Sequence, residues 1–277
     1  RIVLIFMSDK NPEKLILLIA GAKGAVGSTV AAAVAVMQSN PDFILPSLST
    51  GHLFNHLGSP RDTWVGGWDT SPKSMSESLI NHGVIPERIW KSCENDVNEM
   101  PVFQAPESGP DTDKQVAHLV DDIGRMKALY PDSHLVFINL LPANVRRDFS
   151  ACHTLTELYA DDACRDLPDF AYTLAAVLSG VPVVNFSPNE VEIQPVIDES
   201  IRQVVSIAGR DGKTGQTYFK VVLASALKAR NLVVDGWYSL NILGNADGEN
   251  LMDPDCAEGK LSHKTDLLND ILGYNVG

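Results

Sequence analysis

The chain has 277 residues, a formal net charge of −13, a sequence pI of about 4.9 and 44% hydrophobic residues. This is the composition of a soluble globular protein with room for one large or two moderate domains. The acidic excess disfavours nonspecific binding to nucleic acid or to an anionic membrane, and no block of Lys and Arg offsets it.

The cysteines give no sign of a metal site or a disulfide framework. Cys93, Cys152, Cys164 and Cys256 form no Cys-x-x-Cys pair, and no cluster of metal ligands lies beside them. We therefore expect reduced thiols, a cytoplasmic location and no bound metal. The apolar opening, residues 1–6, is too short to span a membrane, so no membrane segment is expected.

Strand and helix patterns alternate along the first two thirds of the chain. Apolar, β-branched runs predict strands at Leu15–Ala20, Phe43–Leu45, Trp64–Val65, Leu135–Leu141 and Val181–Phe186. Helices are predicted over Thr29–Met37, Gln115–Leu129 and Leu167–Leu178. The polar segment Glu94–Asp113 lacks periodicity and is expected to be a surface loop. Strands separated by helices favour an α/β fold, a doubly wound, Rossmann-like dinucleotide-binding domain.

The pattern changes near residue 190. A helix Ile193–Gln203, a short strand Val204–Ala208, a helix Gly215–Ala229 and a long strand-like run Leu232–Leu243 are predicted there. We expect these elements to form a second, α+β layer rather than more of the nucleotide-binding domain. The predicted domains are therefore a Rossmann-like domain, residues 1–190, and a second domain, residues 191–277.

A glycine-rich loop follows the first predicted strand and opens a helix. Gly21 permits the tight turn, Gly24 lets a pyrophosphate approach the backbone, and Gly27 lets the helix pack closely on the sheet. The helix begins near Ala25 and Val26, and its first N–H groups and positive dipole end suit a phosphate. The loop predicts dinucleotide binding, with a purely structural turn as the alternative. A Walker A loop is excluded because Gly27 occupies the position of its lysine.

The acid that binds the ribose of a dinucleotide is displaced in this sequence. It is expected near residues 46–50, at the end of the second strand, and none stands there. Asp69, which follows Gly66-Gly67-Trp68 at the end of the third predicted strand, can replace it. The alternative is that Asp69 caps a helix before Ser71-Pro72.

The segment Gly209–Thr217 has the composition of a second phosphate cradle. A charge, hydroxyls, an amide and backbone N–H groups gather at a predicted helix start, in Lys213, Thr214, Gly215, Gln216 and Thr217. The alternative is a glycine turn in which Thr214 or Thr217 is an ordinary N-cap.

Two later segments add polar groups. Asn245 and Asp247 lie in a small polar stretch after an apolar run, which suits hydroxyl binding or a simple turn. Lys260 and Lys264 recur at helical spacing ahead of an apolar stripe. A lysine in an apolar pocket loses its proton more easily and can act in acid–base catalysis. The alternative is a pair of solvated surface lysines.

These segments, in this order, resemble the motifs of the inositol-3-phosphate synthase (myo-inositol-1-phosphate synthase) family. The resemblance covers Gly21–Thr29, Gly66–Asp69, Leu141–Val145, Asn185–Glu190, Gly209–Thr217, Leu243–Gly248, Lys260 and Lys264. Departures from the family pattern at Ala25, Val26, Val145 and Phe186 mark a divergent member. The family pattern continues past Gly277 with further lysine and aspartate motifs. We therefore expect that the sequence is incomplete at its C-terminus or that the protein lacks part of the site.

The resemblance implies an NAD-retaining isomerase that converts D-glucose 6-phosphate into 1D-myo-inositol 3-phosphate, for inositol and phospholipid biosynthesis. The implied reaction is oxidation, enolisation, intramolecular aldol closure and reduction. The residues implied for NAD are Gly24–Gly27, Asp69, Ala143, Asn144, Asp211 and Asp247. Thr214–Thr217 are implied for the substrate phosphate, and Lys260 and Lys264 for proton transfer. The resemblance also implies a homotetramer, with residues 191–277 as a catalytic and tetramerisation domain that is incomplete at its C-terminus. The alternatives are an NAD-dependent oxidoreductase acting on another sugar phosphate and a catalytically silent NAD-binding paralogue.

Overall fold

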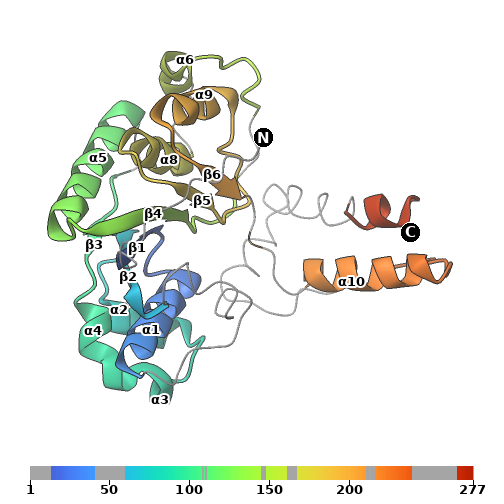
Figure 1. Cartoon of the computed structure of the whole chain (residues 1–277), viewed down its shortest axis with the longest axis horizontal. Coiled ribbons are helices and arrows are strands. Elements are labelled where there is room, and N and C mark those ends of the chain that lie inside the picture. Colours follow the sequence, from blue (N-terminus) through green and yellow to red (C-terminus); the bar gives the residue numbers. More distant parts are fainter. Residues whose placement is uncertain are drawn as a thin grey trace, which may run out of the picture.

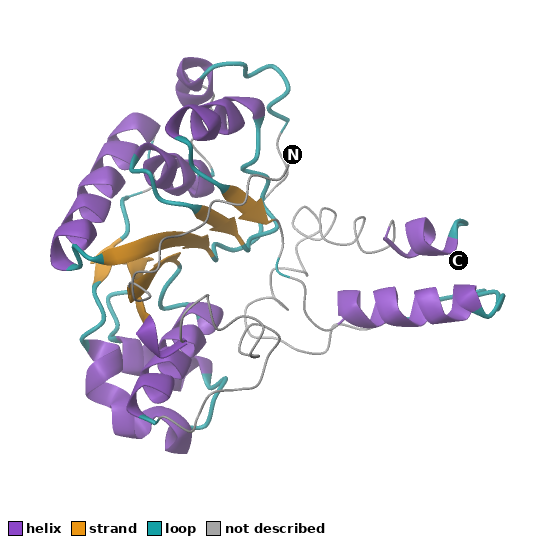
Figure 2. Cartoon of the chain, in the orientation of Figure 1, coloured by secondary structure: helices purple, strands orange, loops and turns teal. Residues whose placement is uncertain are grey.

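A six-stranded parallel sheet with helices on both faces forms the main body of the protein (Figures 1 and 2). The computed structural model describes residues 14–40, 60–107, 109, 111–144, 148–160, 167–209, 212, 216–238 and 267–276. Within these residues the strand order is β3-β2-β1-β4-β5-β6, the order of the common dinucleotide-binding fold. The predicted doubly wound α/β class is confirmed.

All strand pairs are parallel, so the carboxyl ends of the strands meet at one edge of the sheet. The strands are β1 (Lys14–Ala20), β2 (Thr63–Asp69), β3 (Val102–Gln104), β4 (Ser133–Asn139), β5 (Val183–Asn185) and β6 (Ile207–Gly209). The helices are α1 (Ala25–Ser39), α2 (Met75–His82), α3 (Glu87–Trp90), α4 (Glu94–Asn98), α5 (Thr112–Leu129), α6 (Leu155–Ala160), α8 (Pro168–Leu178), α9 (Gln194–Gln203) and α10 (Gln216–Ala229). Short 3₁₀ turns span Pro60–Asp62 and Lys91–Cys93.

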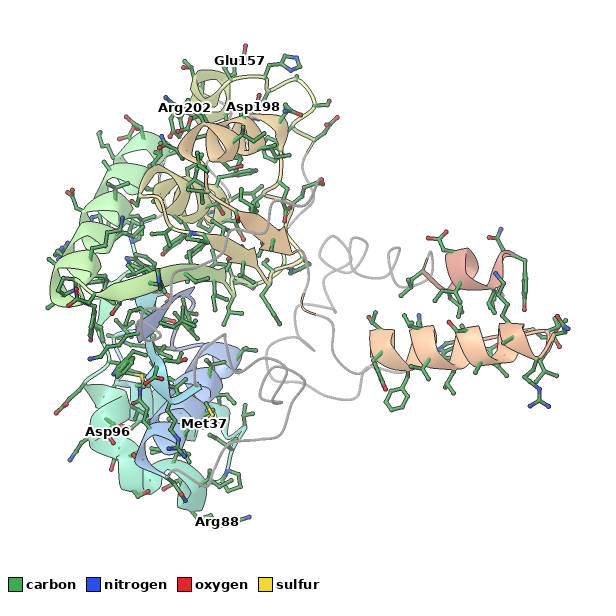
Figure 3. The ribbon with its side chains drawn as sticks, viewed as in Figure 1. Met37, Arg88, Asp96, Glu157, Asp198 and Arg202 are labelled. Atoms are coloured by element: carbon green, nitrogen blue, oxygen red, sulfur yellow. The ribbon has the colours of Figure 1, made fainter. Side chains whose placement is uncertain are left out.

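Each face of the sheet has its own core. Helices α1 to α4 cover one face, where Ile19 and Trp90 are fully buried, and alanines bring α1 close to the sheet. Helices α5, α8 and α9 cover the other, where Phe137 and Leu174 are fully buried. In Figure 3, Met37, Arg88 and Asp96 mark the first group of helices; Asp198 and Arg202 mark α9, and Glu157 marks the neighbouring α6. Burial on both faces explains why the strands read as continuous apolar runs.

The segment predicted as a surface loop, Glu94–Asp113, is partly structured. It contains α4, the edge strand β3 and the start of α5. Val97 is 1% exposed and Ala105 is 8% exposed, so the segment contributes to the core. The prediction was wrong because elements of three to five residues are too short to show a period.

The sheet continues past the predicted domain boundary at residue 190. Strand β6 pairs in parallel with β5, with Ile207 opposite Val183, and α9 packs with α8 on one face of the sheet. The expectation of a separate layer was therefore wrong for α9 and β6. A three-residue strand carries too little pattern to reveal its partner. A second domain after β6 stays a prediction.

Helix α10 and residues 267–272 lie side by side, apart from the sheet in Figure 1. Ala224, Leu268 and Leu272 are buried against one another, and the Lys228 Nζ donates to the Ile271 carbonyl at 2.6 Å. The strand-like run Leu232–Leu243 is not a strand over residues 232–238, where no described strand lies beside it. Its remainder, and the predicted strand Phe43–Leu45, lie outside the described residues. No helix in the described ranges is both long and apolar enough to cross a membrane.

Candidate functional site

The glycine loop after β1 forms hydrogen bonds within itself and with the end of β2. Gly21 has a φ of +82°, and its N–H and that of Ala22 both donate to the Trp68 carbonyl at 3.0 Å. The Gly24 N–H donates to the Gly21 carbonyl at 3.0 Å. A Cβ at Gly27 would lie 2.5 Å from the Gly21 oxygen, so only glycine lets the helix approach the turn this closely. Gly21 and Gly27 therefore have the turn and packing roles predicted for them, while cofactor binding by the loop stays a prediction.

Helix α1 begins at this loop with its first N–H groups open to a ligand. Gly24 is the N-cap and supplies no side-chain cap, and no acidic residue lies in the first turn. The first intrahelical bond is donated by the Ser28 N–H, so the preceding N–H groups of Ala25, Val26 and Gly27 have no helical acceptor. Val26 is 55% exposed. An open helix N-terminus beside a glycine turn fits a pyrophosphate.

Asp69 is the last residue of β2, and its carboxylate is hydrogen-bonded to this loop. Its Oδ2 accepts a hydrogen bond from the backbone N–H of Lys23 at 2.7 Å, and its Oδ1 accepts one from the Ser71 N–H at 2.8 Å. The helix-cap alternative for Asp69 is wrong, because Ser74 caps α2 in a capping box with Glu77. Asp69 is thus part of the loop's architecture at the sheet edge.

The position of β2 in the sheet shows that the predicted strand containing Trp64 and Val65 was numbered wrongly. Trp64 and Val65 were predicted to lie in the third strand, yet β2 pairs directly with β1, which is the place of the second strand in this fold. Asp69 therefore stands where the ribose-binding acid of a dinucleotide fold is expected, although it is more distant in sequence than usual.

Lys23 is held through its backbone and side chain. Besides the bond to Asp69, its Nζ donates to the Ser71 carbonyl at 2.9 Å, and its carbonyl lies 3.0 Å from the Nε2 of His82. His82 is the last residue of α2. The loop is therefore fastened to the connection between β2 and α2, which leaves it preformed for a ligand.

The residues before Asp69 explain the Gly-Gly-Trp-Asp motif. Gly67 has a φ of +140°, and a Cβ there would lie 2.1 Å from the Ile19 oxygen, so β2 can approach β1 only with glycine. Trp68 is 1% exposed and donates from Nε1 to the Asp122 carboxylate at 2.8 Å. The close packing of Gly67 on β1 and the buried bond of Trp68 therefore fix the backbone that carries Asp69.

The residues predicted after β4 lie at the same edge. The Leu140 N–H donates to the Ala20 carbonyl at 3.2 Å, which brings the loop containing Ala143 and Asn144 beside the glycine loop. The Asn144 N–H donates to Asn189 Oδ1 at 2.8 Å. The two loops of the predicted NAD site are therefore neighbours.

The second predicted phosphate loop begins at this edge too. Strand β6 ends at Gly209, and the Gly212 N–H donates to the Phe186 carbonyl at 3.0 Å. A Cβ at Gly212 would lie 1.9 Å from the Phe186 ring. Thr217 lies in the first turn of α10. The side chain of Gln216 lies outside the described residues. So do the remaining predicted site residues: Asp211, Lys213, Thr214, Gly215, Asn245, Asp247, Lys260 and Lys264.

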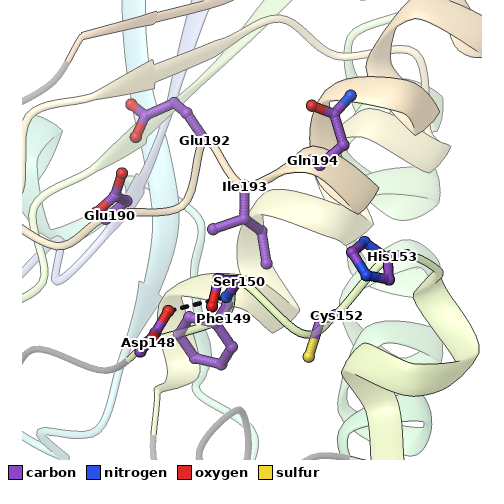
Figure 4. A pocket seen from close by; sticks show the side chains of 9 residues that line it. All are labelled: Asp148, Phe149, Ser150, Cys152, His153, Glu190, Glu192, Ile193 and Gln194. Carbon is purple, nitrogen blue, oxygen red and sulfur yellow. Dashed lines mark hydrogen bonds between the residues drawn. The ribbon is translucent and has the colours of Figure 1, made fainter.

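A hollow of about 810 Å³ opens beside the loop after β5 (Figure 4). Asp148, His153, Glu190 and Glu192 line it with Phe149, and the Ser150 N–H donates to Asp148 at 2.9 Å. None of the described residues predicted to bind NAD lines it. In the described part of the chain, no group of three or more His, Cys, Asp or Glu side chains is arranged to hold a metal ion.

Some residues of the site were missed by the sequence reasoning. They are Lys23, His82, Asn139, Asp169 and Asn189. Asn139 and Asn185 each end an apolar strand, and a polar residue in that position was a usable signal. The bonds of Lys23 and His82 depend on tertiary contacts and leave no mark in the sequence.

Comparisons with known proteins find similar chains that share one family name. Residues 215–277 match the family model described as myo-inositol-1-phosphate synthase. Inositol-3-phosphate synthase isozyme 1 of Arabidopsis thaliana is 28% identical over 240 residues, which cover 78% of this chain and 47% of that protein. Inositol-3-phosphate synthase 1 of Bacteroides thetaiotaomicron is 27% identical over 291 residues, covering 93% and 68%. Over most of its length, this chain is therefore similar to inositol-3-phosphate synthases.

Solved structures of similar proteins share the fold. Inositol-3-phosphate synthase from Caenorhabditis elegans superposes with a TM-score of 0.81 at 20% identity, covering 94% of this chain and 61% of that one. A myo-inositol-1-phosphate synthase-related protein from Thermotoga maritima gives 0.68 at 22% identity, covering 95% and 72%. The chain spans about half the length of the plant synthase that it matches.

Proposed function

We propose that the protein containing this chain is an NAD-dependent isomerase that converts D-glucose 6-phosphate into 1D-myo-inositol 3-phosphate. The observation that carries the proposal is the bond between Asp69 and the glycine loop, at the carboxyl edge of a sheet with the dinucleotide-binding strand order. The names of the similar proteins, together with the motifs in this sequence that resemble the inositol-3-phosphate synthase family, support this reaction over others.

The described residues fit NAD at this edge. The open N–H groups at the start of α1 would face its pyrophosphate, and Gly24 leaves room for the approach. Each Asp69 oxygen accepts one backbone bond and keeps a lone pair for a ribose hydroxyl. A carboxylate there repels a 2′-phosphate, which favours NAD over NADP. When bound, NAD supplies reversible oxidation of a sugar hydroxyl.

The substrate would lie between the NAD loops and the second cradle. Lys213 to Thr217 would hold its phosphate at the start of α10, fixing the open-chain sugar in the folded form that ring closure requires. Lys260 and Lys264 would transfer protons and stabilise negative charge that develops on the sugar. Asp211, Asn245 and Asp247 would complete the NAD contacts.

The assembly proposed is a cytoplasmic homotetramer. Its support is the resemblance together with the surface of α10, where Tyr218, Phe219 and Leu223 are 64%, 59% and 46% exposed. Large apolar side chains gathered on one helix are typical of a surface covered by a partner. The pathway role proposed is inositol and phospholipid biosynthesis.

The experiment is incubation of the full natural protein with glucose 6-phosphate and less than one equivalent of NAD⁺. The expected result is many equivalents of inositol monophosphate per NAD⁺ with no net absorbance gain at about 340 nm, because the cofactor is reoxidised in each turnover. NADH formed in step with product would show an oxidoreductase instead. NAD⁺ binding without any product would show the catalytically silent alternative.

A further inference from the structure

A buried polar network lies beneath the loops that follow β4 and β5. The Asn139 Nδ2 donates to Asp169 Oδ1 at 2.7 Å and to Asn185 Oδ1 at 3.1 Å. The Asn189 Nδ2 donates to the same Asp169 oxygen at 3.1 Å. Asn139, Asp169 and Asn185 are at most 1% exposed, and Asn189 is 9% exposed. Buried polar groups of this kind are costly unless they are satisfied, so their pairing fixes the local geometry.

Asn189 connects this network to the loop after β4. Its Oδ1 accepts the Asn144 N–H at 2.8 Å, and its Nδ2 donates to the Pro142 carbonyl at 2.9 Å. The bond to Asp169 uses the same Nδ2. Only one orientation of the Asn189 amide satisfies all three contacts, because Asp169 and Pro142 offer acceptors and Asn144 offers a donor. One side chain therefore clamps both ends of the segment 142–144.

Asp169 connects the Asn189 side chain to helix α8. It lies in the first turn of α8, where the helix dipole favours a negative charge. Burial raises the pKa of its carboxyl, while the bonds from Asn139 and Asn189 act in the opposite direction. The Asn185 Nδ2 also donates to the Asn189 carbonyl at 2.8 Å, so Asn189 is held at its backbone as well. The loop is thus fixed from α8 through Asp169 and Asn189.

We propose that Asn189, anchored by Asp169, is the positioning residue that preorganises residues 142–144 to receive the cofactor. This inference rests on the proposed function, in which Ala143 and Asn144 contact NAD. A loop held in its binding geometry before the ligand arrives loses less conformational entropy on binding. Asn189 acts through the Pro142 carbonyl and the Asn144 N–H and touches no reacting atom.

The decisive variant is Asn189→Asp, which keeps the shape of the side chain. It replaces the Nδ2 donor by an oxygen that faces the Pro142 carbonyl and the Asp169 carboxylate, so two attractions become repulsions. We expect the Kd for NAD⁺ to rise about tenfold or more and exchange of the Asn144 N–H to accelerate. Asn98→Asp is the charge-matched control, since Asn98 is exposed on α4, remote from the loop, and its side chain exchanges two hydrogen bonds with Ser76.

A double variant separates positioning from damage to the fold. In Asn189→Asp with Asp169→Asn, the amide at position 169 donates to the carboxylate at position 189, which restores this one bond. The Asn139 Nδ2 loses the acceptor it shares with Asn189, and the Pro142 carbonyl still faces an oxygen, so the rescue is partial. We expect the Kd for NAD⁺ to recover part of its loss, and slower exchange at Asn144 than in the single variant. If Asn189→Asp fails to fold, Asp169→Ala replaces it, since this change removes the anchor and leaves the Asn189 contacts to the loop.

The outcomes distinguish this inference from the function on which it rests. A folded Asn189→Asp protein with the wild-type Kd and wild-type protection at Asn144 would overturn the positioning role. A wild-type protein that does not bind NAD⁺ would overturn the proposed function. In that case, hydrogen exchange of the Asn144 N–H is compared between the wild type and Asn189→Asp without any cofactor. Equal exchange rates would show that Asn189 does not order the loop.

Discussion

The Asp69 carboxylate accepts a hydrogen bond of 2.7 Å from the backbone N–H of Lys23 and so joins the end of β2 to the loop after β1. Its other oxygen accepts the Ser71 N–H. One side chain therefore stabilises the turn at the proposed cofactor site and presents a carboxylate at the place where a dinucleotide ribose lies in this fold.

Asp69→Ala removes both contributions. Hydrogen bonds to a charged group contribute about 1.5 to 3 kcal/mol each, so we expect the affinity for NAD⁺ to fall by about tenfold to a hundredfold. The measurement is the Kd for NAD⁺ by calorimetry. Asp198→Ala on the exposed part of α9 removes the same charge and serves as the control. An equal Kd for Asp69→Ala and the wild type would remove Asp69 from the site.

Gly67→Ala tests the close approach of β2 to β1. The new Cβ would lie 2.1 Å from the Ile19 oxygen at a φ of +140°, so the two strands must separate. We expect a loss of more than about 3 kcal/mol in the free energy of unfolding, measured by urea denaturation. Gly124→Ala is the matched control: Gly124 lies inside α5 with nothing within 4 Å of its Cβ position, so a gain of about 1 kcal/mol is expected. Equal effects of the two changes would refute this packing argument.

The buried carboxyl of Asp169 predicts a pH dependence of stability. Burial raises its pKa in the folded protein above the ordinary value of 3.8, so the unfolded chain releases this proton first as the pH rises. The contribution of Asp169 to stability is therefore fully present below 3.8 and is lost as the pH rises through the folded pKa.

Asp169→Asn does not titrate, so it isolates this effect. Urea denaturation from about pH 4 to about pH 8 should show the variant gaining stability relative to the wild type as the pH rises, until the difference levels off above the folded pKa. The neighbouring groups are Asn139 and Asn189, which do not titrate, and Tyr172, whose pKa is raised chiefly by burial and also by Asp69, Asp122 and Asp169. A difference that shrinks as the pH rises would contradict the direction stated here.

Lys264→Ala tests the predicted proton transfer. Loss of a general acid or base typically lowers kcat by about 10² to 10⁴, whereas the predicted NAD contacts lie elsewhere. We therefore expect turnover of glucose 6-phosphate to fall by that factor with an unchanged Kd for NAD⁺. Lys114→Ala on the surface of α5 is the control. Wild-type turnover in Lys264→Ala would remove this residue from the mechanism.

The sequence was sufficient for the fold class, for the central strands of the sheet and for the glycine loop of the candidate site. β1, β4 and the glycine loop were predicted because long apolar runs and Gly21 to Gly27 are local signals. The position of β2 next to β1 was not predicted, because the order of strands in a sheet depends on which strands pair and not on their order in the chain. Asp69 was therefore selected as a cofactor residue while its strand was misnumbered.

The parts that escaped prediction share a physical cause. The roles of Lys23, Asp169 and Asn189 arise from bonds between residues 20 or more positions apart, which no local pattern encodes. The elements between Glu94 and Asp113 escaped because tertiary packing of Val97 and Ala105 decides their structure. Local propensity is a weak guide for such short segments.

A crystal structure of the protein with NAD⁺ decides whether the cofactor lies at the sheet edge between the glycine loop and Asp69. We expect the pyrophosphate at the N–H groups of Ala25 to Gly27 and the adenosine ribose hydroxyls on the Asp69 carboxylate. NAD bound elsewhere on the protein, or with its ribose remote from Asp69, would overturn the proposed site.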